Sequence, residues 1–488
     1  SPQEILTPRT KTILPFSTVL HTADVFLNEV SLYEAYSLEK IFAPDTLWTI
    51  RDPQGCTDIW FAEVGVEATT VYAHFGEADP NKEVVEISVC PTCFYPTREG
   101  LDYITIRGFH ISQAATQWGA PTAEQVGMVA THWYKGWIIE DNVIRNSRAN
   151  GITLGKERSS GYNLDVNDSR LDGTLHYIEV IFNTLRKGWS KEHIGSHIVR
   201  NNVISDCEQT GICGSMGAAF SEIYGNHIYN ILVKQQFGGA EMGGIKLHGA
   251  IDVHIHHNRI HRSGNYGIWL DWMTQGTRVT RNLLHDNRVQ DFSLEVNHGP
   301  IIVDNNLFLS PELAQVKLSQ GVAFVHNTIA WKIWPTGDVD ERQTPYMFPH
   351  DTQIKGYHDC PCGNVCYFNN LLLRENLSMY ENSKLPTKME GNVVDTLVQY
   401  RVEEMADGWY LEFIPTKSLS KECTKALVYS QQLGEAVIPR QRIELPDGKK
   451  AFDKDYLGRK RKKRGNLPGA IEFKGDSRVR VKVYDTWN

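Results

Sequence analysis

Short runs of alternating apolar and polar residues recur along most of the chain. Examples are Val253-His254-Ile255-His256 and Val322-Ala323-Phe324-Val325. A period of two predicts β-strands, because successive side chains of a strand point to opposite faces. No long helical period accompanies these runs, so the pattern predicts an all-β fold.

A repeated asparagine followed by two mostly apolar residues sets the spacing of these strands. It occurs at Asn142, Asn202, Asn226, Asn258, Asn282, Asn306, Asn327 and Asn370. The intervals are 60, 24, 32, 24, 24, 21 and 43 residues, which we interpret as single repeats, a repeat with an inserted loop, and groups of two or more repeats. The leucine spacing of leucine-rich repeats is missing, so the period predicts a parallel β-helix. Asparagine tolerates left-handed backbone angles, and its amide can stack between coils.

The repeat divides the chain into three predicted regions. Residues 1–80 lack it and read as separate strands, which predicts a small β-sandwich-like domain. Residues 81–400 are assigned to the β-helix that carries the site, with regular repeats to about Leu373. Residues 401–488 are predicted to form the end and cap of the helix.

Composition and charge narrow the choice of partners. The chain has 488 residues, of which 41% are hydrophobic and 22% charged, with a net charge of -8, as expected for a folded, water-soluble protein. This charge gives no broad attraction to nucleic acid or to an anionic membrane, and we predict neither as a partner. The basic run 459–464 could bind a polyanion, but we favour a solvated loop.

The nine cysteines leave at least one thiol unpaired, which slightly favours a reducing, cytoplasmic compartment. No export signal is seen, but the sequence starts at Ser1 rather than Met, as it would after removal of a leader or a longer N-terminal region. Cys90 and Cys93 form a CxxC motif, and a second group joins Cys360, Cys362 and Cys366. Both contain prolines and lack zinc-ribbon spacing, so we predict turns rather than metal or redox sites.

Two acids occupy the same position in consecutive repeats. Asp271 lies 11 residues before Asn282, and Glu295 lies 11 residues before Asn306. On neighbouring strands about 4.8 Å apart, their carboxyl groups match the separation of about 5 to 5.5 Å in retaining glycosidases better than the 6.5 to 9.5 Å of inverting ones. Four apolar residues of the same segments are predicted to point into the helix: Ile268, Leu270, Leu294 and Val296.

Aligning the previous coil adds further residues around this pair. Gly244–His248 matches Gly267–Asp271, so Lys246 should share an outward column with Trp269, and His248 should join the two acids. With Trp272 next to Asp271, the patch combines a cation, an imidazole, two acids and indoles. Such a mixture suits a sugar, whose hydroxyls take charged hydrogen bonds while its ring rests on an aromatic face.

The chemistry that follows is glycoside hydrolysis. Two like charges this close raise the pKa of one of them, which keeps a general acid protonated. We expect Asp271 to attack the anomeric carbon, and Glu295 to protonate the leaving oxygen and later activate water. The alternative, two solvated acids on a solenoid face, does not explain the aromatic and Lys-His neighbours.

At these residues the chain resembles the β-xylosidases of glycoside hydrolase family 120. The resembling segments are Pro80–Phe109, Lys135–Glu140, Glu241–His248, Gly267–Met273 with Gly276–Arg278, and Leu294–Pro300. The resemblance implies a right-handed parallel β-helix with a β-sandwich, and release of xylose from the non-reducing end of short β-1,4-xylo-oligosaccharides during xylan degradation, without a cofactor.

The resemblance also implies roles for individual residues. It makes Asp271 the nucleophile and Glu295 the acid/base, and assigns Glu241 and Lys246 to the terminal sugar. We add five predicted substrate-binding residues that neighbour them: His248, Trp269, Trp272, Asn297 and His298.

The resemblance has two departures, and other functions stay open. Family members carry helix strands before the sandwich, and this sequence starts within it, so a subsite wall or helix cap from that region is expected to be missing. Residues 338–366 look like a local elaboration without an assigned role. The rivals are a pectic lyase or polygalacturonase-like hydrolase, and a noncatalytic sugar-binding solenoid. The sequence leaves the exact sugar and any homo-oligomer open.

Overall fold

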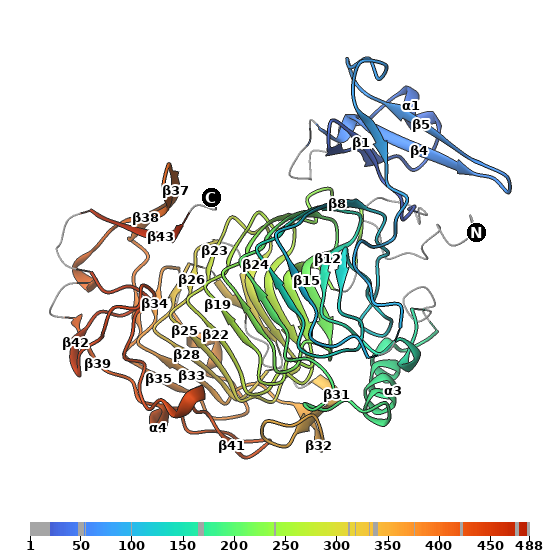
Figure 1. The fold of residues 1–488 in the computed structure, drawn as a ribbon. Helices are drawn as coiled ribbons and strands as arrows, with labels where there is room; N and C mark the ends of the chain where they lie inside the picture. Colours follow the sequence, from blue (N-terminus) through green and yellow to red (C-terminus); the bar gives the residue numbers. More distant parts are fainter. Residues whose placement is uncertain are drawn as a thin grey trace.

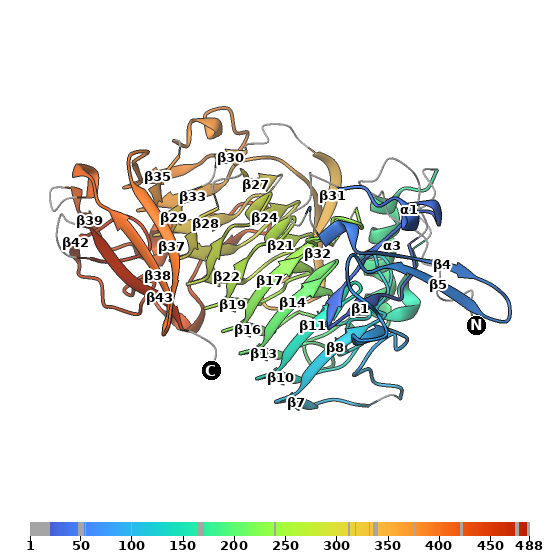
Figure 2. The same cartoon turned by 90° about the horizontal axis from the view of Figure 1, so that it is seen from above.

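The computed structural model describes residues 20–46, 53, 55–98, 100–163, 170–238, 241–310, 313–317, 319–330, 332–334, 340–374, 376–419, 423–473 and 478–485. The fold is almost entirely β, as predicted. Figures 1 and 2 show its body as a right-handed parallel β-helix, with a small N-terminal domain and a C-terminal group of strands at opposite ends. No described helix is long and apolar enough to cross a membrane.

Three long parallel sheets form the walls of the β-helix. Sheet 1 consists of β7 (Thr105–Arg107), β10 (Ile138–Glu140), β13 (Ile198–Arg200), β16 (Glu222–Tyr224), β19 (His254–His256), β22 (Thr277–Thr280), β25 (Ile301–Asp304), β28 (Val322–Val325), β33 (Val365–Phe368) and β35 (Lys388–Glu390). Sheet 2 consists of β8 (His110–Ala114), β11 (Val143–Ser147), β14 (Val203–Cys207), β17 (His227–Ile231), β20 (Arg259–His261), β23 (Leu283–His285), β26 (Leu307–Phe308), β29 (Thr328–Ile329), β34 (Leu371–Leu372) and β36 (Val393–Val394). Sheet 3 consists of β9 (Val129–Ala130), β12 (Asn150–Thr153), β15 (Thr210–Ser215), β18 (Gly243–His248), β21 (Tyr266–Asp271), β24 (Gln290–Glu295), β27 (Leu313–Lys317) and β30 (Lys332–Trp334).

The repeated asparagines form the predicted ladder between sheets 1 and 2. Each side-chain amide donates to the carboxamide oxygen of the next asparagine, at 3.0 Å for the step from Asn258 to Asn282. The ladder continues past the predicted repeats to Asn392, and the helix runs on to Val394. One detail of the prediction is wrong, because the left-handed residue is the one before the asparagine, such as His257 with φ 54°.

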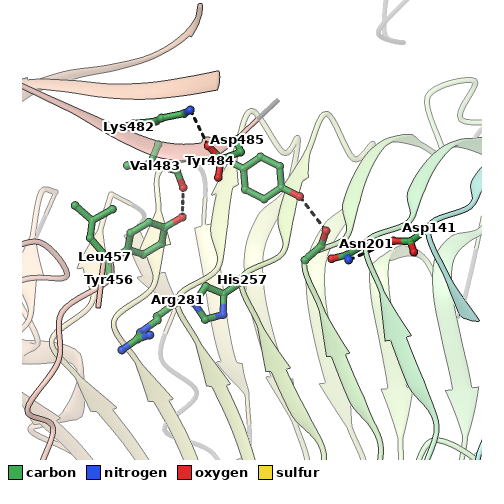
Figure 3. Close-up of a pocket in the computed structure, with 11 residues that line it drawn as sticks. Asp141, Asn201, His257, Arg281, Tyr456, Leu457, Lys482, Val483, Tyr484 and Asp485 are labelled. Atoms are coloured by element: carbon green, nitrogen blue, oxygen red, sulfur yellow. Dashed lines mark hydrogen bonds and ion pairs between the residues drawn. The ribbon is translucent and has the colours of Figure 1, made fainter. Parts of the chain in front are cut away.

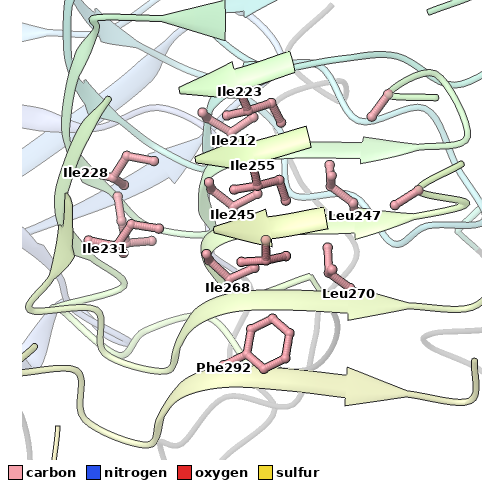
Figure 4. Close-up of a cluster of buried hydrophobic side chains, with 14 of the residues drawn as sticks. Ile212, Ile223, Ile228, Ile231, Ile245, Leu247, Ile255, Ile268, Leu270 and Phe292 are labelled. Atoms are coloured by element: carbon pink, nitrogen blue, oxygen red, sulfur yellow. The ribbon is translucent and has the colours of Figure 1, made fainter. Parts of the chain in front are cut away.

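The interior of the β-helix is filled by apolar side chains in columns that repeat from coil to coil. Ile245, Ile268 and Phe292 form one such column in sheet 3, and Leu247 and Leu270 belong to the next (Figure 4). Burying a large aliphatic or aromatic side chain contributes about 1.5 to 3 kcal/mol, so stacked columns dominate the stability of the helix.

The prediction of inward-pointing residues is confirmed for Ile268, Leu270 and Leu294, which lie in this core. It is wrong for Val296. Strand β24 ends at Glu295, and the left-handed φ of 49° at Val296 turns its side chain into a second apolar cluster outside the helix.

The small N-terminal domain contains two three-stranded sheets and two apolar clusters, one of which joins Val25 of the first sheet to Trp60 of the second. One sheet contains β1 (Val25–Leu27), β2 (Val30–Ser31) and β6 (Val85–Ile87), and the other contains β3 (Tyr33–Glu34), β4 (Ile59–Val64) and β5 (Thr69–His74), with the short helix α1 (Glu39–Phe42) nearby. Because β6 pairs with β1, this sheet includes residues beyond position 80.

A buried ion pair joins the small domain to the β-helix. The Arg148 guanidinium contacts the Glu34 carboxylate, and the two side chains are 0% and 1% exposed. His21 contacts the same carboxylate through Nδ1 at 2.6 Å. A second pair, Lys234 Nζ with Asp24 Oδ2 at 3.3 Å, lies at the same junction.

Glu34→Gln is expected to lower the free energy of unfolding by about 3 to 5 kcal/mol, because it leaves the Arg148 guanidinium buried without its counter-charge. Chemical denaturation of the variant and the unchanged protein measures the difference. The matched control is Glu29→Gln, which breaks the contact with Arg145 at the same junction, where the Glu29 side chain is 61% exposed. That change should cost no more than about 1 kcal/mol. Equal losses in both variants would contradict the buried-pair argument.

The C-terminal strands cover outer faces of the helix. The sheet of β37 (Gln399–Met405), β38 (Gly408–Ile414) and β43 (Val479–Asp485) packs through Leu411 and Val481 on Leu283 and Leu307 of sheet 2. The shorter elements are β39 (Lys425–Ala426), β42 (Arg464–Asn466), β40 (Glu435–Ala436), β41 (Gln441–Arg442) and α4 (Ser430–Leu433). Tyr484 of β43 donates a hydrogen bond to the carbonyl of Gly225 at 3.2 Å. Both residues line a pocket of about 590 Å³, part of which is drawn in Figure 3.

The basic run 459–464 is only partly a solvated loop. Arg461 is 2% exposed, pairs with Glu472 at 3.3 Å and donates to the carbonyls of Lys454 and Gly469. This arginine therefore ties the C-terminal loops together, because a guanidinium can satisfy several acceptors at once.

Two insertions cover the outer face of sheet 3, and the sequence pattern did not predict their structure. The first is helix α3 (Gly173–Arg186), which starts at the Asp172 cap and buries Tyr177 and Val180. The second is the antiparallel hairpin of β31 (Asp340–Met347) and β32 (Ile354–Cys360).

The clustered cysteines fall into different parts of the packing. Cys360 and Cys362 lie in the apolar cluster shared by α3 and the hairpin, whereas Cys366 lies in a separate cluster on sheet 1. Cys90 and Cys93 are exposed.

Candidate active site

The predicted register of the site is confirmed. Asp271, the last residue of β21, is paired with Glu295, the last residue of β24. On the other side, β18 pairs His248 with Asp271 and Lys246 with Trp269. The ends of the three strands β18, β21 and β24 therefore present a cation, an imidazole and two carboxylates on one outer face of sheet 3.

Asp271 is surrounded by positive charge. Its Oδ2 lies 2.7 Å from Lys246 Nζ and 3.3 Å from His248 Nε2, and its Oδ1 accepts the backbone N–H of Trp272 at 2.9 Å. Burial alone would raise the pKa of Asp271, but Lys246 and His248 outweigh it and hold the pKa well below its ordinary value. The two cations therefore favour the ionised form of Asp271.

Glu241 completes a buried chain of charges behind Asp271. Its Oε1 lies 2.8 Å from His248 Nδ1 and 3.8 Å from Lys246 Nζ, and the Glu241 and Lys246 side chains are both 0% exposed. Burial opposes ionisation of Glu241, but the charges of His248 and Lys246 lower its pKa. Glu241 thus places a second carboxyl group against Lys246 and His248.

Glu295 has a different environment from Asp271. Its side chain is 14% exposed, and its Oε1 lies 3.5 Å from the guanidinium of Arg342 on β31. One acid of the pair is thus enclosed by cations, while the other borders solvent. An asymmetry of this kind is what allows two neighbouring carboxyl groups to take different roles.

Trp269 provides an aromatic surface at the site. Lys246 Nζ lies 3.4 Å from the centre of its ring, and the centre of the Tyr266 ring lies 4.5 Å from it in a tilted arrangement. The indole Nε1 is buried, and it has no hydrogen-bond partner among the described residues. Ser293, in register with Trp269 on β24, has a buried hydroxyl in the same situation. Both groups could hydrogen-bond to a sugar hydroxyl.

Comparison with family models and solved structures identifies the family of this chain. A family model described as the glycoside hydrolase 120 insertion domain matches residues 13–87, and a right-handed β-helix model matches residues 131–329. The solved structure of XylC in complex with xylose is 36% identical, with a TM-score of 0.90, and the match covers 99% of this chain and 84% of that chain. The chain belongs to glycoside hydrolase family 120.

Two other solved structures match this family 120 protein far more weakly. A solved structure described as a glycoside hydrolase has a TM-score of 0.37 at 11% identity, covering 67% of this chain and 58% of that chain. Pectate lyase Pel9A has a TM-score of 0.31 at 9% identity, covering 63% of this chain and 70% of that chain. At these TM-scores neither match bears on function. No curated protein matches the chain.

Three predicted substrate-binding residues of this family 120 hydrolase are occupied by protein contacts. Trp272 is 5% exposed and packs edge-on against Tyr177 at 5.3 Å. Asn297 accepts from the backbone N–H of Thr274 at 2.9 Å, and His298 Nε2 lies 2.8 Å from the Thr344 hydroxyl. Their polar or aromatic surfaces contact the turns behind the site, and direct sugar contact by these three residues stays a prediction.

Two residues that the repeat pattern does not predict reach the site from the insertions. Tyr177 of α3 lies edge-on to His248 at a ring distance of 5.0 Å, and its hydroxyl lies 3.0 Å from Ser215 Oγ. Arg342 of the hairpin contacts Glu295. Neither belongs to a repeat, so alignment of the chain to itself could not find them. For Tyr177, the sequence signal was the helical spacing of apolar residues in the 14-residue segment Gly173–Arg186.

His248 should make the stability of the folded hydrolase depend on pH. Burial and Lys246 lower its pKa, but the carboxylates of Glu241 and Asp271 outweigh them and raise it above 6.5. The stabilisation it provides is then complete below about pH 6.5 and is lost as pH rises through the folded-state pKa. Comparing urea denaturation of the unchanged protein and His248→Gln should give a stability difference that shrinks at alkaline pH.

His298 is the control for this titration, because burial lowers its pKa to about 4. The stabilisation from neutral His298 is present above about pH 6.5 and is lost as pH falls toward 4, so the His298→Gln difference should change in the opposite direction. A His248→Gln difference that grows as pH rises would contradict the assigned charge state.

Proposed function

We propose that this family 120 hydrolase is a retaining β-xylosidase that releases xylose from the non-reducing end of short β-1,4-xylo-oligosaccharides. The observation that carries the proposal is the paired register of Asp271 and Glu295, which gives two acids on adjacent strands with different surroundings. The likeness to XylC, whose structure was solved with xylose, supports the choice of sugar.

In the first step, the Asp271 carboxylate attacks the anomeric carbon while the glycosidic C–O bond breaks. Glu295 transfers its proton to the departing oxygen, and a covalent xylosyl ester forms on Asp271. Lys246 and His248 keep Asp271 ionised before attack, and their positions fix the direction of its oxygens. Adjacent parallel strands lie about 4.8 Å apart, a spacing that suits two carboxyl groups acting on one glycosidic bond.

In the second step, Glu295 takes a proton from water, and the water oxygen attacks the same carbon. The ester bond breaks, Asp271 is released as a carboxylate, and the anomeric configuration of the product matches that of the substrate. The partial exposure of Glu295 gives this water a route to the site. Glu241 and Lys246, fully buried beside the pair, are the residues we assign to the terminal sugar.

Cleavage at a chain end is supported by the two insertions beside sheet 3. Tyr177 from α3 contacts His248, and Arg342 from the hairpin contacts Glu295, so side chains from both insertions reach the strand ends that carry the acids. An enzyme that cleaves within a chain needs an open groove on both sides of the scissile bond.

The deciding experiment follows hydrolysis of p-nitrophenyl β-xyloside and of reduced xylotriose by proton NMR. We expect β-xylose as the first product in both cases, because a reduced chain still offers its non-reducing end. α-Xylose as the first product would disprove retention, and cleavage only within longer chains would disprove exo action. Titration heat from xylose without turnover would favour a noncatalytic sugar-binding solenoid. p-Nitrophenyl β-glucoside serves as the substrate control for sugar choice.

A further inference from the structure

A second group of chemically active side chains lies on the outer face of sheet 1, away from the carboxylate pair of sheet 3. It contains Glu222 of β16 and His254 and His256 of β19. We propose that these three residues bind one divalent cation of the zinc class and so link two consecutive coils of the helix.

The fold brings the three ligands together without any loop. His254 and His256 are two residues apart on one strand, so their side chains point to the same face. Glu222 is in register with His254 on the preceding coil. Strand pairing therefore fixes the relative positions of two imidazoles and one carboxylate before any ion arrives.

The distances suit a small transition-metal ion. One ligand atom from each residue lies within 4.8 Å of the others. Glu222 Oε1 lies 2.8 Å from His256 Nε2 and 3.9 Å from His254 Nδ1. Tetrahedral zinc with bonds of about 2.0 to 2.1 Å places its ligand atoms roughly 3.4 Å apart, so small side-chain rotations are enough.

A neighbouring residue orients the His256 ring, and His254 borders a surface pocket. His256 Nδ1 lies 2.7 Å from His257 Nδ1, and a hydrogen bond at the far nitrogen is the usual way that a metal-binding imidazole is held. His254 Nε2 is buried and has no hydrogen-bond partner among the described residues. His254 also lines a surface pocket of about 600 Å³, which gives an ion a path to the site.

The neighbouring charges do not exclude a cation. Arg278 is in register with His254, but its Nε and one Nη donate to the Asp304 carboxylate, at 2.7 and 2.9 Å. Arg281 contributes positive charge near His256. Two nitrogens and one oxygen favour zinc, cobalt or nickel over calcium or magnesium, which require mostly oxygen ligands. Water can complete the coordination.

The test titrates Co²⁺ into the tag-free, chelator-treated full chain and follows its visible absorption. We expect one tetrahedral Co²⁺ per chain, its displacement by Zn²⁺, and a higher unfolding temperature with either ion, because the ion binds only the folded arrangement. Glu222→Gln and His254→Gln should each weaken Co²⁺ binding by about 100-fold or more, since even losing a residue that supports a ligand costs about 10 to 100-fold.

The matched control is His350→Gln, because His350 lies in the same pocket and pairs with Asp252 instead. That variant should bind Co²⁺ as the unchanged protein does. Normal xyloside hydrolysis by Glu222→Gln and His254→Gln shows that they are folded, since neither residue belongs to the sugar site. No tetrahedral Co²⁺ in the unchanged protein, unchanged binding in the two ligand variants, or equal loss in His350→Gln would each overturn the proposal.

Discussion

Asp271→Asn is expected to lower kcat for p-nitrophenyl β-xyloside by about 10⁴-fold or more, because the amide cannot form the covalent ester and binding contacts alone supply little of the rate. The change keeps the side-chain volume and the contact with the backbone N–H of Trp272. Steady-state kinetics at saturating substrate measures the loss, and it should appear in kcat rather than in KM.

The matched control is Asp291→Asn on the same strand as Glu295. Asp291 is also buried, but its carboxylate is bonded to Ser310 and Asn287 away from the strand end. This variant should lose stability while keeping kcat within a few-fold. Adding azide to Asp271→Ala should yield α-xylosyl azide by direct displacement. Full activity in Asp271→Asn would remove Asp271 from the mechanism.

Glu295→Gln is expected to show a loss that depends on the leaving group. For xylobiose, whose departing oxygen needs a proton, kcat/KM should fall by about 10² to 10⁴-fold, the usual contribution of a general acid. For 2,4-dinitrophenyl β-xyloside the departing phenolate needs no proton, so the first step should be almost unaffected. The xylosyl ester should then accumulate, and a burst of dinitrophenol should be visible in stopped-flow absorbance.

Azide separates the two roles of Glu295. It needs no base to attack, so it should restore turnover of the dinitrophenyl substrate by Glu295→Gln and give β-xylosyl azide. The unchanged protein, which has its own base, should gain nothing from azide. Equal losses for xylobiose and the dinitrophenyl substrate would show that Glu295 is not the acid.

The β-helix and the position of the acids could be predicted because both depend on register. Each asparagine of the ladder marks the same turn, so a fixed offset of 11 residues identifies Asp271 and Glu295 as neighbours. The periodic alternation within strands also gave the inward direction of Leu270 and Leu294. It failed at Val296, because a left-handed residue directly after a strand breaks the alternation.

The insertions beside the site could not be predicted, because they lie outside the repeat and cannot be aligned with other coils. Helix α3 and the β31–β32 hairpin occupy the long intervals between asparagines, and their packing on sheet 3 depends on tertiary contacts such as Tyr177 with Trp272. The motif around Glu295 predicts sugar contacts for Asn297 and His298, and the structure adds hydrogen bonds of these residues to Thr274 and Thr344. The position of a residue in a motif does not show where its side chain points.

The in-register stacking of sheet 3 limits the distances between catalytic acids that evolution can produce on this scaffold. Separations along the helix axis come in multiples of one strand spacing, so loop changes leave the distance between the acids unaltered. Position 317 is the next in this column after Asp271 and Glu295. A carboxylate there would lie about 9.6 Å from Asp271, near the upper limit for inversion. Moving one acid by a single coil would thus be the smallest step on this scaffold from a retaining to an inverting geometry.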